Sequence, residues 1–240
     1  MDFTNQLVVI TGVGRVGQVG EALAWSFARR GATLALLDHG RTEVEARAAE
    51  LREAGFAATA HAADLADAGA ASAVAADVLA ATRDRFGGAV HAVICAAGGF
   101  GTTGPIDASD PAGWRRQFTI NLDTAFGTTR AFLPAVREGK GAFVYFGSVA
   151  ALPGGNPSGM AAYAAAKSGV LTLMSTVARE EGRNGVRANA VVPTSVRTSS
   201  NVASMGDDGP YVERESVADV VAFLAGEQAR NVNGQAIRLA

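Results

Sequence analysis

The chain is poor in cysteine, histidine, charged and aromatic residues. Its 240 residues include one cysteine, Cys95, and three histidines; 18% are charged, 7% are aromatic, and the net charge is −2. A single cysteine excludes an intrachain disulfide and a cysteine-rich metal site, and no metal is expected. The small net charge provides no strong field to attract nucleic acid or an acidic membrane surface.

Long apolar runs are also absent. No stretch approaches the roughly 20 apolar residues that span a bilayer. The first residues, Met1–Asn5, lack the basic segment that opens a secretory signal, and the scarcity of cysteine agrees with a reducing compartment. We therefore expect a cytoplasmic protein that has neither a membrane nor nucleic acid as its partner.

Hydrophobic residues make up 48% of the chain, and short β-branched runs alternate with alanine-rich helical patterns. This alternation is typical of βαβ units, and strands that are apolar throughout indicate a sheet covered on both faces. We expect an α/β protein with one domain over residues 1–240, a Rossmann-type doubly wound parallel sheet of about seven strands with helices on both faces. The expected strands are Leu7–Ile10, Thr33–Leu37, Ala57–His61, Val90–Cys95, Ala142–Phe146, Arg187–Val192 and Gln235–Leu239. The expected helices lie near 20–30, 42–54, 67–86, 112–136, 158–183 and 216–226.

A glycine-rich segment joins the first expected strand to the first expected helix. It contains Gly12, Gly14, Gly17 and Gly20. Glycines let the backbone turn tightly and approach a pyrophosphate, and the N-terminus of the following helix offers N–H groups to the anion. The second strand then ends at Asp38, where a carboxylate can accept hydrogen bonds from both ribose hydroxyls of adenosine. Together these features predict dinucleotide binding; the alternative is a glycine turn and a solvated acid.

The choice of cofactor depends on charge around the adenosine ribose. Asp38 favours NAD because its carboxylate would repel a 2′-phosphate. Arg15, His39 and Arg41 are near enough in sequence to accommodate that phosphate, although Arg15 can also be a solvated loop residue. We expect NAD as the cofactor, with NADP as the less favoured alternative.

Tyr163 and Lys167 are four residues apart, so on a helix they share one face. A phenol is a poor base at neutral pH, and a nearby ammonium would lower its pKa. Ser148 upstream offers a hydroxyl that would hold a substrate oxygen. Taken alone, the spacing also fits an ordinary exposed helix pair.

Several motifs fall at the ends of expected strands or in the helix between them. They are Thr11-Gly12 with the following glycines, Asp64-Leu65, Ala96-Ala97-Gly98, Asn121, Ser148, Tyr163 with Lys167, and Asn189–Pro193 with Thr198. In this respect nearly the whole chain resembles the short-chain dehydrogenase/reductase family, including its 3-oxoacyl-ACP reductase-like and secondary-alcohol dehydrogenase members.

The resemblance implies a role for each matching residue. Asn121, Ser148, Tyr163 and Lys167 would be catalytic. The cofactor would contact Gly12, Gly14, Arg15, Gly17, Gly20, Asp38, Asp64, Leu65, Ala97, Gly98, Tyr163, Lys167, Pro193, Val196 and Thr198. Some of these positions have local alternatives: Asp64 and Thr198 can cap helices, and Asn121 can be an interior helix residue.

The sequence also departs from the family pattern. The glycine loop is longer by about two residues, which leaves open whether Gly14 or Gly17 takes the middle position. Cys95 and Ala96 stand where the family has asparagines, and Cys95 is expected to be a buried small hydrophobe. The expected substrate lid, at about 199–215, is short and polar, which suggests an open site or a lid supplied by a neighbouring subunit.

The implied function is an NAD(P)-dependent oxidoreductase that interconverts a carbonyl and a secondary alcohol. The expected pocket is formed by Phe100, Ala150, Pro153, Met160 and Thr194, together with Gly99 and Leu152. No lysine or arginine lies in 98–110 or 149–160, so we expect a small neutral carbonyl or alcohol substrate. The alternatives are a catalytically silent dinucleotide-binding regulator and a Rossmann-like methyltransferase.

The helices near 112–136 and 158–183 contain many small residues. Small residues suit close packing between subunits, and the family commonly forms dimers and tetramers, so we expect a homodimer or homotetramer. The alternative is that these alanines pack only on the sheet.

Overall fold

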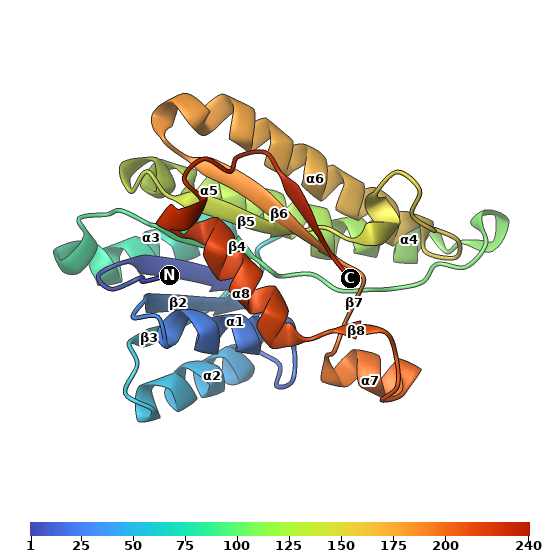
Figure 1. Cartoon of the computed structure of the whole chain (residues 1–240), viewed down its shortest axis with the longest axis horizontal. Coiled ribbons are helices and arrows are strands. Elements are labelled where there is room, and N and C mark those ends of the chain that lie inside the picture. The colour runs from blue at the N-terminus through green and yellow to red at the C-terminus, as the bar shows by residue number, and fades with distance from the viewer.

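Seven parallel strands form the central sheet, and their order places the site. The structure is a computed structural model that describes residues 1–240. The sheet order is β3-β2-β1-β4-β5-β6-β9, and every neighbouring pair is parallel. The strands are β1 (Leu7–Thr11), β2 (Thr33–Asp38), β3 (Ala58–Ala62), β4 (Ala92–Cys95), β5 (Ala142–Phe146), β6 (Arg187–Pro193) and β9 (Ala236–Leu239). The expected single-domain, doubly wound α/β fold is confirmed (Figure 1).

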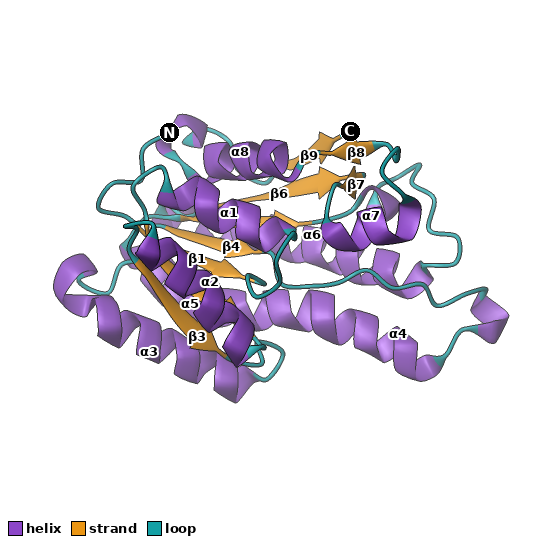
Figure 2. Ribbon diagram, turned by 90° about the horizontal axis from the view of Figure 1, so that it is seen from below, coloured by secondary structure: helices purple, strands orange, loops and turns teal.

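Helices cover both faces of the sheet, as Figures 1 and 2 show from two directions. One buried cluster joins the sheet to α1 (Val19–Ala28), α2 (Arg41–Glu53) and α8 (Arg214–Ala225). A second cluster joins the opposite face to α3 (Ala68–Phe86), α5 (Thr124–Glu138) and α6 (Ala161–Glu181). The inner strands β1, β4, β5 and β6 are buried on both sides, which explains why their sequences do not alternate, whereas the edge strands β3 and β9 are only partly buried. No helix combines the length and the apolar character needed to cross a membrane.

The strand order reverses between β1 and β4. Strands β2 and β3 continue to one side of β1, whereas β5, β6 and β9 continue to the other side of β4. In a parallel sheet the carboxyl ends of all strands lie at one edge, and ligands bind there where the order reverses. We therefore expect the ligand site to lie between the loops that follow β1 and β4.

Some element boundaries differ from the expectation. The helix expected at 112–136 is α4 (Pro111–Phe118), a π-helical turn (Thr119–Asp123) and α5. The expected strand at 90–95 begins at Ala92, because the N–H of Val90 bonds instead to Ala135. The helix expected at 158–183 begins at Ala161.

Three elements of the region between β6 and α8 were not expected. Strands β7 (Ser195–Val196) and β8 (Tyr211–Val212) pair in a small separate sheet, and the helix α7 (Ser199–Met205) lies between them. Thr198 begins α7, because its hydroxyl accepts a hydrogen bond from the N–H of Asn201.

Gly20 allows α1 to pack directly on the loop after β1. A Cβ atom at this position would overlap the carbonyl oxygen of Gly12 and lie 2.9 Å from the Cα atom of Val13. Because these contacts are backbone atoms, no side-chain rotation can relieve them. Gly20 therefore sets the distance between α1 and the first strand, as the third glycine of a dinucleotide loop does.

We expect Gly20→Ala to lower the free energy of unfolding by about 2–4 kcal/mol, because an added methyl group meets fixed backbone. Urea denaturation of the free protein measures this. Gly113→Ala in α4 is the matched control, since its Cβ would lie 3.4 Å from the nearest atom. The control should leave the stability unchanged or raise it by up to about 1 kcal/mol. Equal stabilities of the two variants would contradict the packing role.

Candidate active site

Thr11 joins the ends of β1 and β4 at the point where the sheet order reverses. Its buried hydroxyl donates to the carbonyl of Ile94 at 3.3 Å and accepts from the N–H of Ala97 at 3.0 Å. Gly12 follows with a φ of 77°, and a Cβ there would lie 2.8 Å from the Cα atom of Ala97. The two loops thus touch through backbone, which leaves their outer surface to a ligand.

Asp38 at the end of β2 is held by the glycine loop itself. Its Oδ2 atom accepts from the N–H of Gly14 at 2.8 Å, and its Oδ1 atom accepts from the N–H of Gly40 at 3.1 Å. The side chain is 12% exposed. Two backbone bonds aim the carboxylate at the place where a dinucleotide loop presents its ribose.

A second carboxylate, Glu43 at the start of α2, lies beside Asp38. A Cβ on Gly40 would lie 2.5 Å from its Oε2 atom and 3.7 Å from the Oδ1 atom of Asp38. We did not predict this residue from the sequence. The signal would have been its position in the first turn of the helix that follows Asp38, the acid expected to bind the ribose.

The basic residues near Asp38 are exposed or paired. His39 is 90% exposed and its Nδ1 atom lies 3.0 Å from the Oδ1 atom of Asp38. Arg41 lies 3.5 Å from the carboxylate of Glu45, and Arg15 is exposed. The charge around Asp38 is therefore mainly negative.

Gly14 and Gly17 have different roles in the longer loop. Gly14 contacts Asp38, as described above. Gly17 has a φ of 71°; its N–H donates to the Oε2 atom of Glu21 at 2.7 Å, and its carbonyl accepts from the N–H of Ser199 at 2.9 Å. Glu21 was also missed, although an acid in the first turn after an anion-binding loop is a usable signal.

This edge fits a dinucleotide. The turn of Gly12 leaves no room for a Cβ, Asp38 is fixed toward the loop, and Gln18 at the start of α1 makes no side-chain cap. Uncapped N–H groups at a helix N-terminus are the donors that a pyrophosphate uses.

Tyr163 and Lys167 lie on α6, opposite the end of β5. The Nζ atom of Lys167 donates to the carbonyl of Phe146 at 3.0 Å and lies 5.9 Å from the centroid of the Tyr163 ring. Lys167 is 6% exposed and Tyr163 is half-buried. The alternative of an exposed helix pair is therefore wrong.

Ser148 follows the end of β5 and faces the same phenol. It is 7% exposed and caps the short 3-10 helix Val149–Ala151, accepting from the N–H of Ala150 at 3.3 Å. Its hydroxyl lies near the Tyr163 phenol and lowers the pKa of that phenol. The Ser148 hydroxyl after β5 and the phenol and ammonium of α6 thus lie on the same side of the sheet edge.

Burial shifts the pKa values of the pair in opposite directions. It raises the pKa of Tyr163, and the nearby Ser148 hydroxyl offsets part of this rise. It lowers the pKa of Lys167 to about 8. The net shift of the tyrosine pKa is opposite to the lowering expected from Lys167, because desolvation of the phenolate is its largest cause.

Asn121 lies in the π-helical turn and is 1% exposed. Its amide donates to the carbonyl of Gly99 at 3.0 Å and accepts from the N–H of Gly99 at 3.2 Å. Its nitrogen also donates to the carbonyl of Gln117. A Cβ at Gly98 would lie 2.6 Å from the Asn121 oxygen and 3.4 Å from the Lys167 nitrogen. Asn121 is therefore satisfied by the loop after β4, close to Lys167.

Phe100 covers the Tyr163 ring edge-to-face, with 5.2 Å between centroids, and is itself 61% exposed. The N–H groups of Thr103 and Gly104 donate to the carbonyl of Gly159, which joins the two loops expected to bind substrate. Among the other expected pocket residues, Ala150 lies in the 3-10 helix, Pro153 in the exposed loop after it, Met160 just before α6 and Thr194 after β6.

The remaining expected cofactor residues lie at the same edge or near it. Thr198 caps α7, as its local alternative expected, whereas Asp64 accepts from the N–H of Ala66 at 2.9 Å within the loop and the cap of α3 is Asp67. Three others, Leu65, Pro193 and Val196, are buried. Cys95 is buried beneath this edge, and burial raises the pKa of its thiol to about 12, as expected for an inert cysteine.

The glycine loop after β1 and Asp38 together form what we call the dinucleotide cradle. With the pair of Tyr163 and Lys167, this cradle defines an oxidoreductase of the Rossmann class. A family model described as enoyl-(acyl carrier protein) reductase matches residues 12–239. The chain belongs to the short-chain dehydrogenase/reductase family, which confirms the resemblance seen in the sequence.

The relatives cover nearly the whole chain. The 2-(S)-hydroxypropyl-CoM dehydrogenase 3 of Xanthobacter autotrophicus is 34% identical over 97% of this chain and 94% of its own length. The meso-2,3-butanediol dehydrogenase of Serratia marcescens is 32% identical over 98% of this chain and 92% of its own. The crystal structure of levodione reductase has a TM-score of 0.86 and 29% identity, covering 99% of this chain and 96% of that one. The protein is an NAD(P)-dependent oxidoreductase that interconverts a carbonyl and a secondary alcohol.

Replacing Lys167 by methionine should remove one source of pH-dependent stability. The folded-state pKa of Lys167 is about 8, below its value of 10.5 in the unfolded chain. The unfolded chain therefore binds more protons between these values, and wild-type stability rises with pH there. Relative to Lys167→Met, wild type should gain about 2 kcal/mol between about pH 7 and pH 9.5. Urea denaturation of both proteins at the two pH values measures this gain. A constant difference would show that Lys167 titrates normally.

Proposed function

We propose that this dehydrogenase uses NAD(H) to interconvert a small, neutral secondary alcohol and its ketone, with Tyr163 as general acid and base. One observation carries the proposal: Ser148, Tyr163 and the buried Lys167 meet at the carboxyl edge of the sheet, beside the loop anchored by Asp38. A protein that only sensed the dinucleotide would not need a proton-transferring group there.

The chain's own residues handle the proton and the oxygen. When bound, the nicotinamide cofactor supplies or accepts the hydride. Tyr163 transfers a proton to or from the substrate oxygen, and Ser148 donates a hydrogen bond to that oxygen. With a pKa of about 8, Lys167 is mostly charged at neutral pH. Its ammonium favours the phenolate that alcohol oxidation requires, and it binds the nicotinamide ribose.

The raised pKa of Tyr163 keeps the phenol protonated at neutral pH. This is the form that donates a proton to a ketone oxygen during reduction. Asn121 holds the Gly99 backbone beside Lys167 and so supports a proton relay toward solvent.

NAD is the proposed cofactor because two carboxylates lie at the adenosine end. Asp38 is fixed by two backbone N–H groups, and the carboxylate of Glu43 lies next to it. A 2′-phosphate placed there would meet two negative charges, whereas ribose hydroxyls would donate to them.

A neutral substrate is proposed because the pocket loops lack basic residues. Residues 98–110 and 149–160 contain no lysine or arginine, and the Phe100 ring packs edge-to-face with Tyr163. The segment 199–215, which includes α7, is the proposed lid over this side of the site.

We also propose that the protein is a cytoplasmic homodimer or homotetramer. The π-interrupted helix 111–138 leaves two large side chains exposed, Trp114 at 37% and Phe126 at 53%. Covering them against a second copy would bury apolar surface.

Tyr163→Phe should lower kcat by about a hundredfold or more, because the proton has no other positioned carrier. NADH affinity, measured by fluorescence, should change by less than about threefold. Tyr145→Phe is the matched control: it removes only the hydroxyl that contacts Thr129 at 2.8 Å in the core, and it should retain activity. Turnover by Tyr163→Phe at the wild-type rate would refute the role of Tyr163. NADH binding by wild type without turnover on a broad panel of ketones would instead favour a silent regulator.

The enzyme should prefer NAD over NADP by about a hundredfold or more in kcat/KM. Asp38→Ser should reduce this ratio by about tenfold, and Glu43→Gln by a smaller factor, because each removes one negative charge. The exposed Glu53 at the end of α2 provides the control variant, Glu53→Gln. Parallel assays with both nicotinamides measure the ratio, and equal use of NADP by wild type would overturn the assignment.

A further inference from the structure

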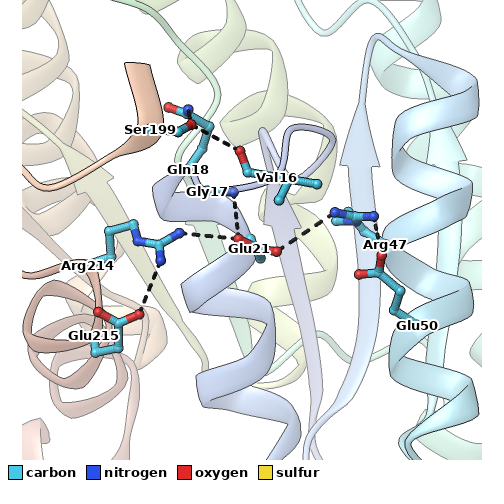
Figure 3. Close-up of polar contacts among 9 residues, drawn as sticks. All are labelled: Val16, Gly17, Gln18, Glu21, Arg47, Glu50, Ser199, Arg214 and Glu215. Atoms are coloured by element: carbon cyan, nitrogen blue, oxygen red, sulfur yellow. Dashed lines mark hydrogen bonds and ion pairs between the residues drawn. The ribbon is translucent and has the colours of Figure 1, made fainter. Parts of the chain in front are cut away.

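The segment Val16–Gln18 of the glycine loop contacts the start of the lid. The Nε2 atom of Gln18 donates to the hydroxyls of Ser199 at 2.7 Å and Ser200 at 2.9 Å. The N–H of Ser199 donates to the carbonyl of Gly17 at 2.9 Å, and its hydroxyl donates to the carbonyl of Val16 at 3.3 Å. Figure 3 shows Gln18, Ser199 and Val16 at this contact. Four hydrogen bonds thus join segments at opposite ends of the chain.

Gly17 permits this close approach. A Cβ atom there would lie 2.8 Å from the hydroxyl oxygen of Ser199 and 2.9 Å from its Cβ atom. The φ of 71° is also one that other residues rarely adopt. The backbone at this position is therefore shaped by α7 as well as by the turn it makes.

The far end of the lid is tied to the same loop. Arg214 lies near the end of the lid segment, where α8 begins, and its Nη1 atom lies 3.2 Å from the Oε2 atom of Glu21. That oxygen also accepts the N–H of Gly17. Figure 3 shows Glu21 between Arg214 and Arg47, with Arg47 at 3.8 Å. Gly17 is thus connected to both ends of the lid. Its carbonyl accepts from Ser199 directly, and its N–H donates to Glu21, which pairs with Arg214.

The second tie is partly shielded from solvent. Glu21 is 19% exposed, and the side chains of Arg47 and Arg214 are 10% and 26% exposed. Shielded pairs are weakened less by salt than surface pairs. The two guanidinium groups also offset the negative charge that Glu21 places in the first turn of α1, where an anion would bind.

We propose that Val16–Gln18 is a latch between the dinucleotide cradle and the lid, with Gln18 as its positioning residue. The proposal rests on the proposed function, because it assigns a purpose to the cradle and the lid of that same site. A dinucleotide that orders the glycine loop then also orders α7. The substrate-binding side of the site is therefore fully formed only after the cofactor has bound.

Hydrogen exchange of the α7 amides, with and without saturating NADH, tests the latch in the full-length protein. In wild type, NADH should slow exchange in both the glycine loop and α7. In Gln18→Ala, NADH should still slow exchange in the loop, but the protection of α7 should fall by about fivefold to tenfold, as for the loss of one net hydrogen bond. Unchanged protection of α7 would overturn the latch.

A control and a coupling measurement separate a latch from a general loss of stability. Gln228→Ala changes an exposed glutamine in the 3-10 helix Glu227–Ala229 and should leave α7 protection intact. The Ser200 hydroxyl accepts from Gln18 alone. Replacing Ser200 by alanine should therefore weaken the protection of α7 in wild type but add little to Gln18→Ala. Fully additive effects would contradict a shared contact.

Kinetics give an independent readout. Gln18→Ala should raise the KM for the alcohol while kcat stays within about twofold, because α7 positions substrate without touching the reacting atoms. A fall in kcat at unchanged KM would overturn this role.

The outcome also distinguishes the latch from the proposed function. If wild type gives no NADH fluorescence change, the proposed cofactor use fails. The latch is then judged on the free proteins: faster α7 exchange in Gln18→Ala supports it, and equal exchange refutes it.

Discussion

The hydrogen bond between the ammonium of Lys167 and the carbonyl of Phe146 determines the arrangement of the site. A buried charge without a counter-ion is expensive, and here one carbonyl dipole at the end of β5 is its named partner. This contact fixes α6 against the sheet, which sets Tyr163 one turn earlier and in line with Ser148, two residues beyond Phe146. Close to the ammonium the chain uses glycine, because a Cβ atom at Gly98 would lie 2.6 Å from the neighbouring Asn121 oxygen. The same burial lowers the lysine pKa and raises the tyrosine pKa, so both shifts have one origin.

The sequence predicts the sheet and most helices because their signals are local. Strands such as β1 and β2 are continuous apolar runs, and Asp38 is recognisable because it ends one of them. The π-helical turn at Thr119–Asp123 has no such signal, because it depends on the contact between Asn121 and Gly99, which lie 22 residues apart. The helix α7 was likewise missed because its sequence is polar. Glu21 and Glu43 were missed because acids at the starts of helices are usually solvated, and only the folded chain brings them to the glycine loop.

The two ends of the glycine loop differ in the charges of the side chains around them. The end near Asp38 and Glu43 is negative, while the carboxylate of Glu21 is flanked by Arg47 and Arg214. This difference suits a ligand whose ends differ, with hydroxyls to donate at one end and an anion near the other. The direction of the tyrosine pKa shift could not be predicted from spacing alone. The four-residue interval places Tyr163 near Lys167, whereas burial decides which protonation state of the phenol is favoured.

Cys95, the chain's single thiol, lies in the central strand β4 and is 5% exposed. A reagent can reach it only when the middle of the sheet opens, and the raised pKa keeps the sulfur protonated until then. Cys95 is therefore an intrinsic probe of the opening of the core. The rate of its modification by a thiol reagent under native conditions reports that motion without any introduced label.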